Sequence, residues 1–298
     1  MNSDFVKGVV VPILTPIDGS EKIDEAAMRR MVNYVIQGGV DGILLYGSNG
    51  EFFAIDDDGE FERGIDIALS EIKGRVPLYA GIGSITTRKC IIRAERAAEK
   101  GVQAISILQP MFLSPRDDNL YDHFAAIAGS VRDLPVLLYN NPRAGYGISP
   151  ALTARLNRDI DNIVGVKDSS GNMNILAEYV RLTEGTGFKV LAGKDTLIFA
   201  SLAQGAVGCV ATTANFVPAL VVDIYRRYMA GDMDGARKAQ FRLTPIRLAM
   251  DLADFPAGTK DMANLMGLNA GPPYLPNKSA TGSTLEQMRA VLKESGLL

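Results

Sequence analysis

The chain has 298 residues, of which 47% are hydrophobic and 22% are charged, and its formal net charge is −3. This composition is that of an ordinary globular protein, and the small net charge gives no electrostatic reason to expect a nucleic-acid partner. No apolar run approaches the roughly 20 residues that a transmembrane helix needs, so no membrane partner is expected either. The N-terminal segment lacks the pattern of a signal peptide, and Cys90 and Cys209 are widely separated, which predicts a cytoplasmic location.

Short apolar runs alternate with amphipathic segments along most of the chain. The runs are nearly continuous, as in parallel strands that are buried on both faces. The expected strands cover residues 8–16, 40–47, 76–83, 104–110, 135–141, 162–170, 188–193 and 206–214. Several of the helical patterns between them end in glycine, a common signal for the end of a helix. Repeated strand–helix units of this kind predict a (β/α)8 TIM barrel. An open doubly wound sheet is the alternative, which the lack of GxGxxG after the first strand disfavours.

After Asn215 the pattern is helical, and it is longer than the single helix needed to close the eighth unit. We therefore expect residues 1–223 to form the barrel and residues 224–298 to form a C-terminal helical extension packed on it. A proline- and glycine-rich connector, NAGPPYLPNKSATGS, lies within this extension.

His123 is the single histidine of the chain, and no Cys/His cluster is present. A catalytic zinc typically has two or three such ligands, so no metal is expected. A Ser-His-Asp triad would depend on His123 alone. Its helical spacing beside Phe124 and Ile127 instead favours a histidine on the face of a helix.

In a barrel enzyme the functional residues lie at the C-terminal ends of the strands. Lys167 ends the apolar run 163–166. Burial disfavours the ammonium form of a lysine, which frees the amine to attack a carbonyl carbon. The alternative is a structural lysine paired with a neighbouring acid such as Asp168.

Two further strand ends carry polar groups. Tyr139 ends the fifth strand, next to the sixth in a barrel, where its hydroxyl can deliver a proton to a carbinolamine; it could equally be a core or rim tyrosine. In the turn GSNG at 47–50, successive backbone N–H groups can point at an anion, and Ser48 adds a hydroxyl. This would suit the carboxylate of a 2-oxo acid, although any tight turn after a strand also uses glycine.

These three sequence features together resemble those of the dihydrodipicolinate synthase and N-acetylneuraminate lyase superfamily of class I, Schiff-base aldolases. GSNGE at 47–51, YNNP at 139–142 and GVKDSSG at 165–171 match its carboxylate-binding, tyrosine and lysine motifs. The resemblance spans nearly the whole chain and implies Lys167 as the nucleophile and Tyr139 as the proton donor, with Ser48 and Asn49 on the carboxylate. It also implies a homotetramer built from dimers, and chemistry that needs no cofactor. GKD at 193–195 and VATTAN at 210–215 fall at further strand ends, so the expected substrate contacts include Ser169, Gly193, Asp195, Val210 and Thr212.

The chain departs from the resemblance at two positions. Dihydrodipicolinate synthases of the family place an arginine five residues after the tyrosine to bind the semialdehyde carboxylate, but here Ala144 stands there and Arg143 comes one place early. Phe112 matches the tyrosine that those enzymes donate across a subunit interface, so their proton relay is interrupted. Both departures count against a role in lysine biosynthesis.

The expected activity is therefore the cleavage or formation of a C–C bond between pyruvate and an aldehyde. GSNGEF resembles members acting on 4-hydroxy-2-oxoglutarate, and the first expectation is a 2-keto-3-deoxy sugar acid or 4-hydroxy-2-oxo acid substrate. The alternatives are a dehydratase using the same lysine imine, then a dihydrodipicolinate synthase. Because of Phe112, a barrel that binds 2-oxo acids without turnover also stays open.

Overall fold

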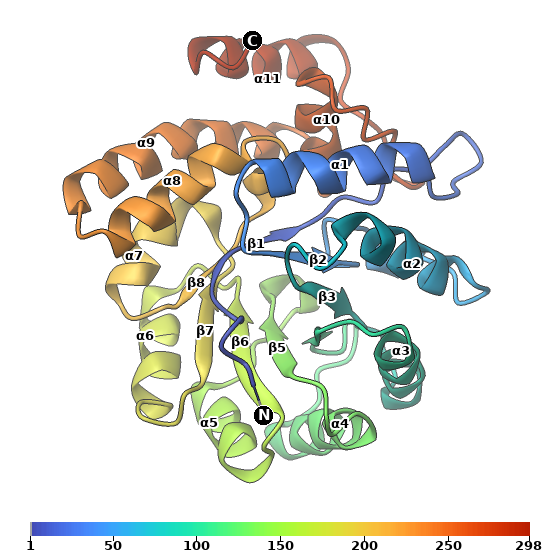
Figure 1. The fold of residues 1–298 in the computed structure, drawn as a ribbon, viewed down its shortest axis with the longest axis vertical. Coiled ribbons are helices and arrows are strands. Elements are labelled where there is room, and N and C mark those ends of the chain that lie inside the picture. Colours follow the sequence, from blue (N-terminus) through green and yellow to red (C-terminus); the bar gives the residue numbers. More distant parts are fainter. Residues whose placement is uncertain (1) are drawn as a thin grey trace.

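The computed structural model describes residues 2–298 and shows a closed barrel of eight parallel strands in sequential order (Figure 1). The predicted TIM barrel is confirmed. The strands are β1 (Gly8–Pro12), β2 (Gly42–Leu45), β3 (Leu78–Gly81), β4 (Ala104–Leu108), β5 (Val136–Asn140), β6 (Ile163–Asp168), β7 (Lys189–Ala192) and β8 (Gly208–Val210). They are shorter than the predicted runs because apolar residues continue into buried loops. Ile13 and Leu14, for example, follow β1 and are 0% exposed.

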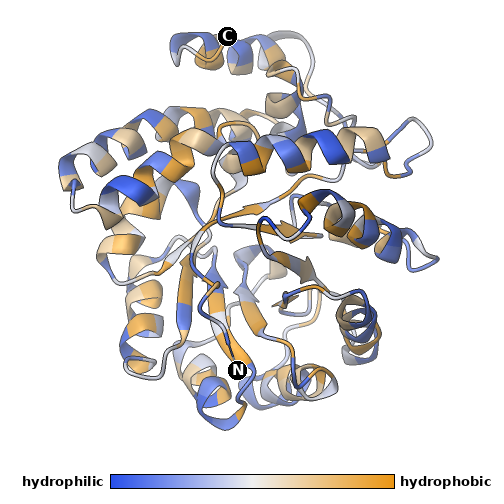
Figure 2. Cartoon of the chain, viewed as in Figure 1, coloured by the Kyte–Doolittle hydropathy of each residue, from blue (hydrophilic) through white to orange (hydrophobic). Residues whose placement is uncertain are grey.

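A helix follows each strand and covers the outside of the barrel. These helices are α1 (Glu25–Gln37), α2 (Glu60–Ile72), α3 (Thr87–Glu99), α4 (Asp117–Ser130), α5 (Pro150–Asp159), α6 (Met173–Leu182), α7 (Ile198–Ala203) and α8 (Pro218–Met229). Hydrophobic residues dominate the strands, whereas the helices mix hydrophilic and hydrophobic residues (Figure 2). This is the pattern of amphipathic helices that bury one face against a sheet.

Short 3-10 helices occupy four of the loops after the strands. They are η1 (Phe52–Ala54), η2 (Pro142–Ala144), η3 (Asp195–Leu197) and η4 (Thr212–Asn215). Since these loops lie at the C-terminal ends of β2, β5, β7 and β8, they fix the backbone at the barrel mouth, where the sites of such folds are built.

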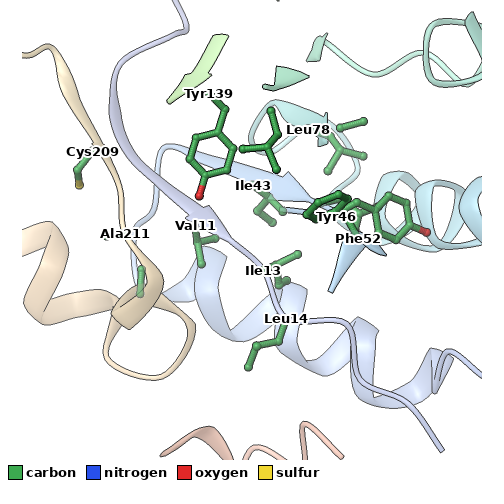
Figure 3. Close-up of a cluster of buried hydrophobic side chains, with 14 of the residues drawn as sticks. Val11, Ile13, Leu14, Ile43, Tyr46, Phe52, Leu78, Tyr139, Cys209 and Ala211 are labelled. Carbon is green, nitrogen blue, oxygen red and sulfur yellow. The ribbon is translucent and has the colours of Figure 1, made fainter. Parts of the chain in front are cut away.

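The chain forms two apolar clusters. The larger one fills the space between strands and helices, and Figure 3 shows part of it around Tyr46 and Phe52. The smaller one fills the barrel interior and contains Val6, Val10, Leu44, Tyr79, Ala104, Leu137, Val164, Leu191 and Val210. Because the interior cluster closes the barrel below, any site must open at the C-terminal ends of the strands.

Four elements follow the eighth unit: α9 (Met233–Ala249), η5 (Met250–Leu252), α10 (Ala257–Leu265) and α11 (Gly282–Glu294). The boundary expected at residue 223 falls inside α8, which continues to Met229. Helix α9 packs against α8, and α11 lies at the outer edge of the molecule (Figure 1). Residues 257–263 of α10 are all buried. Within residues 2–298, no helix is long and apolar enough to cross a membrane.

The barrel closes where β8 meets β1 through two glycines. Gly8 pairs with Gly208, and a Cβ atom on Gly208 would clash with the Gly8 carbonyl oxygen. Closure at this point therefore depends on the absence of a side chain.

We predict that Gly208→Ala lowers the free energy of unfolding by about 3 kcal/mol, at the upper end of the range for overpacking a close-packed interior. Urea denaturation followed by circular dichroism measures this change. Gly129→Ala in α4 is the matched control, because no atom lies within 4 Å of the added Cβ; it should be neutral or stabilising by up to about 1 kcal/mol. A Gly208→Ala protein as stable as the wild type would contradict this closure.

Candidate active site

Lys167 lies inside the barrel near the C-terminal end of β6. Its side chain is 4% exposed, and in the ladder between β5 and β6 it stands opposite Tyr139. The Lys167 Nζ atom lies 3.9 Å from the centre of the Tyr139 ring. The structure therefore brings together the two residues that the sequence singles out for chemistry.

Asp168, the acid considered as a structural partner for Lys167, makes its bonds elsewhere. It follows Lys167 on the same strand, and successive side chains on a strand point to opposite faces. Its carboxylate accepts hydrogen bonds from Asn140 Nδ2 at 2.7 Å and from Ser170 Oγ at 2.8 Å. Burial raises the pKa of Asp168, although these hydrogen bonds act in the opposite direction. Asp168 thus fixes the loop after β6 and leaves the amine directed into the barrel.

Tyr139 has a hydrogen-bonded phenol directed away from β5 (Figure 3). Its oxygen lies 3.3 Å from Ser48 Oγ and accepts a hydrogen bond of 2.8 Å from Asn141 Nδ2. Burial acts to raise the pKa of Tyr139, but the charge of Lys167 and hydrogen bonds from Ser48, Ser169 and Lys167 outweigh it and lower the pKa. The phenol is thereby prepared to give up and recover a proton. Sequence reasoning assigned no role to Asn141, although it lies within the YNNP motif.

The turn after β2 presents backbone donors at the mouth. Ser48 and Asn49 are buried, and within residues 2–298 their backbone N–H groups have no hydrogen-bond acceptor. The Asn49 side chain is engaged at both ends: its Nδ2 donates to Thr212 Oγ1 at 2.8 Å, and its Oδ1 accepts from Thr259 Oγ1 at 3.0 Å. Asn49 therefore holds the turn in place and offers its backbone to an anion such as a carboxylate.

A buried ion pair supports the same turn from the C-terminal extension. The Glu51 carboxylate lies 2.6 Å from Lys260 Nζ, and both side chains are 0% exposed. Lys260 also donates to the Pro272 carbonyl at 2.7 Å, and Glu51 accepts from the Tyr274 N–H at 2.9 Å. Burial lowers the pKa of Lys260, and Glu51 offsets part of this shift. Helix α10 thus reaches the substrate-facing turn through Thr259 and Lys260, which the sequence did not single out.

The other predicted contacts divide into two groups. Ser169 donates to the Gly193 carbonyl at 3.2 Å, so these two lie together where β6 and β7 end. Thr212 contacts Asn49, as described above, and lines the mouth. Asp195 is buried and accepts from Thr213 Oγ1 and from the Thr213 N–H, both at 2.7 Å, so its carboxylate holds the loop after β8. Val210 packs in the interior cluster and forms part of the floor.

A cavity of about 300 Å³ lies beside Asn49 and Thr212, against the start of the C-terminal extension. Its walls include Asn49, Thr212, Thr259, Arg143 and Arg247. The Arg143 guanidinium lies 4.0 Å from the centre of the Phe255 ring, which holds it at the mouth. Although Ala144 takes the position where an arginine was expected, the structure supplies a guanidinium to the same mouth from the preceding residue. The sequence argument from Ala144 against a carboxylate-bearing second substrate therefore loses much of its force.

Phe112 lies outside this arrangement. Its side chain is 92% exposed and its φ of 69° is in the left-handed region, uncommon for a bulky residue. It does not take part in the network around Tyr139 within this chain.

The described residues also bear on metal binding. Within residues 2–298, no group of three or more His, Cys, Asp and Glu side chains is placed to hold a metal ion. His123 is buried on α4 and bonds to Thr87 Oγ1 at 2.9 Å, and burial lowers its pKa to about 4. It therefore belongs to the helical layer and not to the mouth.

The structure combines a closed barrel, a buried lysine beside a phenol, and a turn with free N–H groups. This combination is that of a class I aldolase, an enzyme that makes or breaks C–C bonds through a Schiff base. The chain belongs to the Dihydrodipicolinate synthetase family, which matches residues 5–295. It is accordingly a pyruvate-dependent carbon–carbon lyase.

The relatives cover the chain almost completely. A 4-hydroxy-tetrahydrodipicolinate synthase from Nitratidesulfovibrio vulgaris is 36% identical and covers 98% of this chain and 99% of its own length. The enzyme of that name from Methanopyrus kandleri is 34% identical, with 98% and 97% covered. The crystal structure of dihydrodipicolinate synthase from Thermotoga maritima superposes with a TM-score of 0.95 at 30% identity, covering 99% of this chain and 100% of that one. These comparisons favour the synthase, which the sequence analysis ranked below a sugar-acid aldolase.

For the buried ion pair we predict that Lys260→Met lowers the free energy of unfolding by about 3 to 5 kcal/mol, because it leaves the Glu51 carboxylate buried without its cation. The double variant Glu51→Gln with Lys260→Met removes both charges and should regain most of this loss. Chemical denaturation of the three proteins measures both effects. Arg237→Met, which removes an exposed partner of Asp234, is the matched control and should change stability by less than about 1 kcal/mol. If Lys260→Met and Arg237→Met lowered the free energy of unfolding by the same amount, the role given to Lys260 would be contradicted.

Proposed function

We propose that Lys167 forms a Schiff base with pyruvate and that the resulting enamine adds to, or is released from, an aldehyde. The observation that carries this proposal is the Lys167 amine beside the Tyr139 phenol, inside a barrel whose mouth offers the free N–H groups of Ser48 and Asn49. The turn binds the pyruvate carboxylate, which places the keto carbon at the amine.

The chemistry follows from these positions. The Lys167 amine attacks the keto carbon, and Tyr139 transfers the proton from nitrogen to the new oxygen. Tyr139 then protonates the carbinolamine hydroxyl, which leaves as water, and the phenolate is left beside the iminium. Because its pKa is lowered, the phenolate is stable enough to take a proton from C3 and give the enamine. In the cleavage direction the same steps run in reverse, and no cofactor takes part.

The second substrate is an aldehyde with a carboxylate, which Arg143 binds at the mouth. Its guanidinium lines the cavity with Asn49 and Thr212 and is held by Phe255. A planar guanidinium binds a carboxylate through two parallel hydrogen bonds. Thr212 and Thr259 add hydroxyl groups that suit a hydroxylated substrate chain.

Two kinds of substrate are proposed, each on its own observation. The full-length similarity to 4-hydroxy-tetrahydrodipicolinate synthases favours aspartate semialdehyde as the acceptor, and we place it first. Ala144, Phe112 and the hydroxyl-lined mouth favour a 4-hydroxy-2-oxo acid or a 2-keto-3-deoxy sugar acid, as does Ser169 beside the mouth.

The oligomeric state and the cellular location of the protein are proposed separately from its activity. We propose a cytoplasmic homotetramer, a dimer of dimers. Phe112, Phe53, Ile85 and Leu113 follow neighbouring strands and are exposed hydrophobic residues, which supports burial of this face against a second copy. Sedimentation velocity measures the assembly, and a monomer at micromolar concentration would exclude it.

We predict that borohydride reduction with pyruvate adds a stable adduct at Lys167 and that Lys167→Ala abolishes the adduct. Mass spectrometry of the peptide that contains residue 167 measures this. Adduct formation that persists undiminished in Lys167→Ala would exclude the proposed nucleophile.

Turnover of a substrate panel then decides between the acceptors. Aspartate semialdehyde with pyruvate, 4-hydroxy-2-oxoglutarate and 2-keto-3-deoxy sugar acids are each incubated with the enzyme, and the products are identified by mass spectrometry. Release of pyruvate and an aldehyde identifies an aldolase, whereas a dehydrated product identifies a dehydratase. Trapping without turnover of any substrate would identify a 2-oxo-acid-binding protein.

We also predict that Tyr139→Phe lowers kcat by about 10² to 10⁴-fold, the usual contribution of general acid–base assistance, because Phe112 supplies no second phenol. Steady-state kinetics with the substrate found in the panel measures this loss. Tyr146→Phe is the control, since the Tyr146 hydroxyl donates to the Pro110 carbonyl and takes no part in the site. Near-normal turnover by Tyr139→Phe would exclude the proton path described above.

A further inference from the structure

Ser106 is a polar residue on the inner face of the barrel wall. It lies in β4 between Ala104 and Leu108, and Ala104 belongs to the interior cluster. Because inward side chains alternate along a strand, Ser106 points inward as well. Its side chain is 6% exposed and borders a small cavity, where a hydroxyl can bind a water molecule.

The Ser106 hydroxyl faces a small cavity that it shares with the catalytic groups. The cavity has a volume of about 10 Å³ and is lined by Ser106, Ser48 and Tyr139. Its remaining walls are mostly apolar and include Leu44, Phe52, Leu108 and glycines of β3 and its loop. One water molecule needs roughly this volume and two to four polar partners. Three residues that carry hydroxyl groups line this one water-sized space.

We propose that this cavity is a binding site for a single water molecule, held by Ser106, that completes the proton path between Tyr139 and Ser48. The inference rests on the proposed function. Tyr139 and Ser48 are separated by 3.3 Å, a long distance for a hydrogen bond between hydroxyls, and the water bridges them with shorter bonds. When Tyr139 becomes a phenolate, the water donates a hydrogen bond to its oxygen and accepts one from Ser106.

This arrangement supplies what Phe112 does not. The exposed Phe112 ring carries no hydroxyl, so the proton cannot pass through a phenol at that position. Ser106 is a positioning residue, because it acts on the reacting atoms only through the water. The chemistry is balanced: the proton that Tyr139 gives to the carbinolamine is replaced by the one it takes from C3, and the water, Ser48 and Ser106 shift protons along their hydrogen bonds without net gain or loss.

The test is exchange of the pyruvate C3 protons with deuterated water, followed by NMR, because this reports enamine formation whatever the second substrate is. Ser106→Val removes the hydroxyl and fills the cavity with two methyl groups. We expect exchange to fall about 10- to 100-fold, with borohydride trapping at Lys167 and the affinity for pyruvate unchanged. Thr153→Val in α5 replaces a hydroxyl by a methyl group at a residue that is 0% exposed and belongs to the helical layer, and it should leave exchange unchanged.

Two further readouts separate a relay from a structural effect. Loss of a hydrogen bond to the phenolate raises the pKa of Tyr139, so the pH profile of exchange should move to higher pH in Ser106→Val. In mixtures of light and heavy water, the wild-type rate should curve with deuterium content, as expected for several moving protons, and the curve should become linear in the variant.

If Ser106→Val does not fold, Ser106→Ala keeps the space for the water but removes one partner, and exchange should fall about 3- to 10-fold. Wild-type exchange in a folded Ser106→Val, or in Ser106→Ala, overturns the inference. A wild-type protein that gives no adduct at Lys167 would instead overturn the proposed function, so the two failures are distinguishable.

Discussion

In a closed parallel barrel, inward side chains alternate with those that face the helices, so the register between β5 and β6 decides which residues meet inside. That register sets Tyr139 opposite Lys167 and turns Asp168 toward the outside. A shift by one residue would exchange the lysine for the aspartate and leave the amine among the helices. The meeting of Lys167 and Tyr139 therefore depends on backbone hydrogen bonds between β5 and β6, although the backbone groups themselves take no part in the chemistry.

The turn after β2 is held in place by contacts from the C-terminal extension. Thr259 fixes the Asn49 side chain, and Lys260 neutralises Glu51 beside the same turn. Since the Asn49 amide is occupied at both ends, the turn can offer backbone N–H groups in one orientation only. Precise placement of donors before the substrate arrives is what gives such groups their effect on charged intermediates.

The sequence predicted the barrel and the meeting of Lys167 with Tyr139, because continuous apolar runs and polar strand ends are local signals. It did not predict the contribution of α10. Thr259 and Lys260 meet Asn49 and Glu51 across more than two hundred residues of chain, and nothing in a helical pattern states what a helix packs against. The contacts of Arg143 were not predicted for a related reason: counting residues from Tyr139 cannot show that a guanidinium one place early lines the cavity and stacks on Phe255.

The dependence of the turn on α10 also orders events during protein synthesis. When β8 has emerged from the ribosome, the nascent chain already contains Lys167, Tyr139 and every strand of the barrel. The turn after β2 still lacks its contacts with Thr259 and Lys260, which are translated later. The order of that turn therefore depends on α10, which is made only after every strand of the barrel.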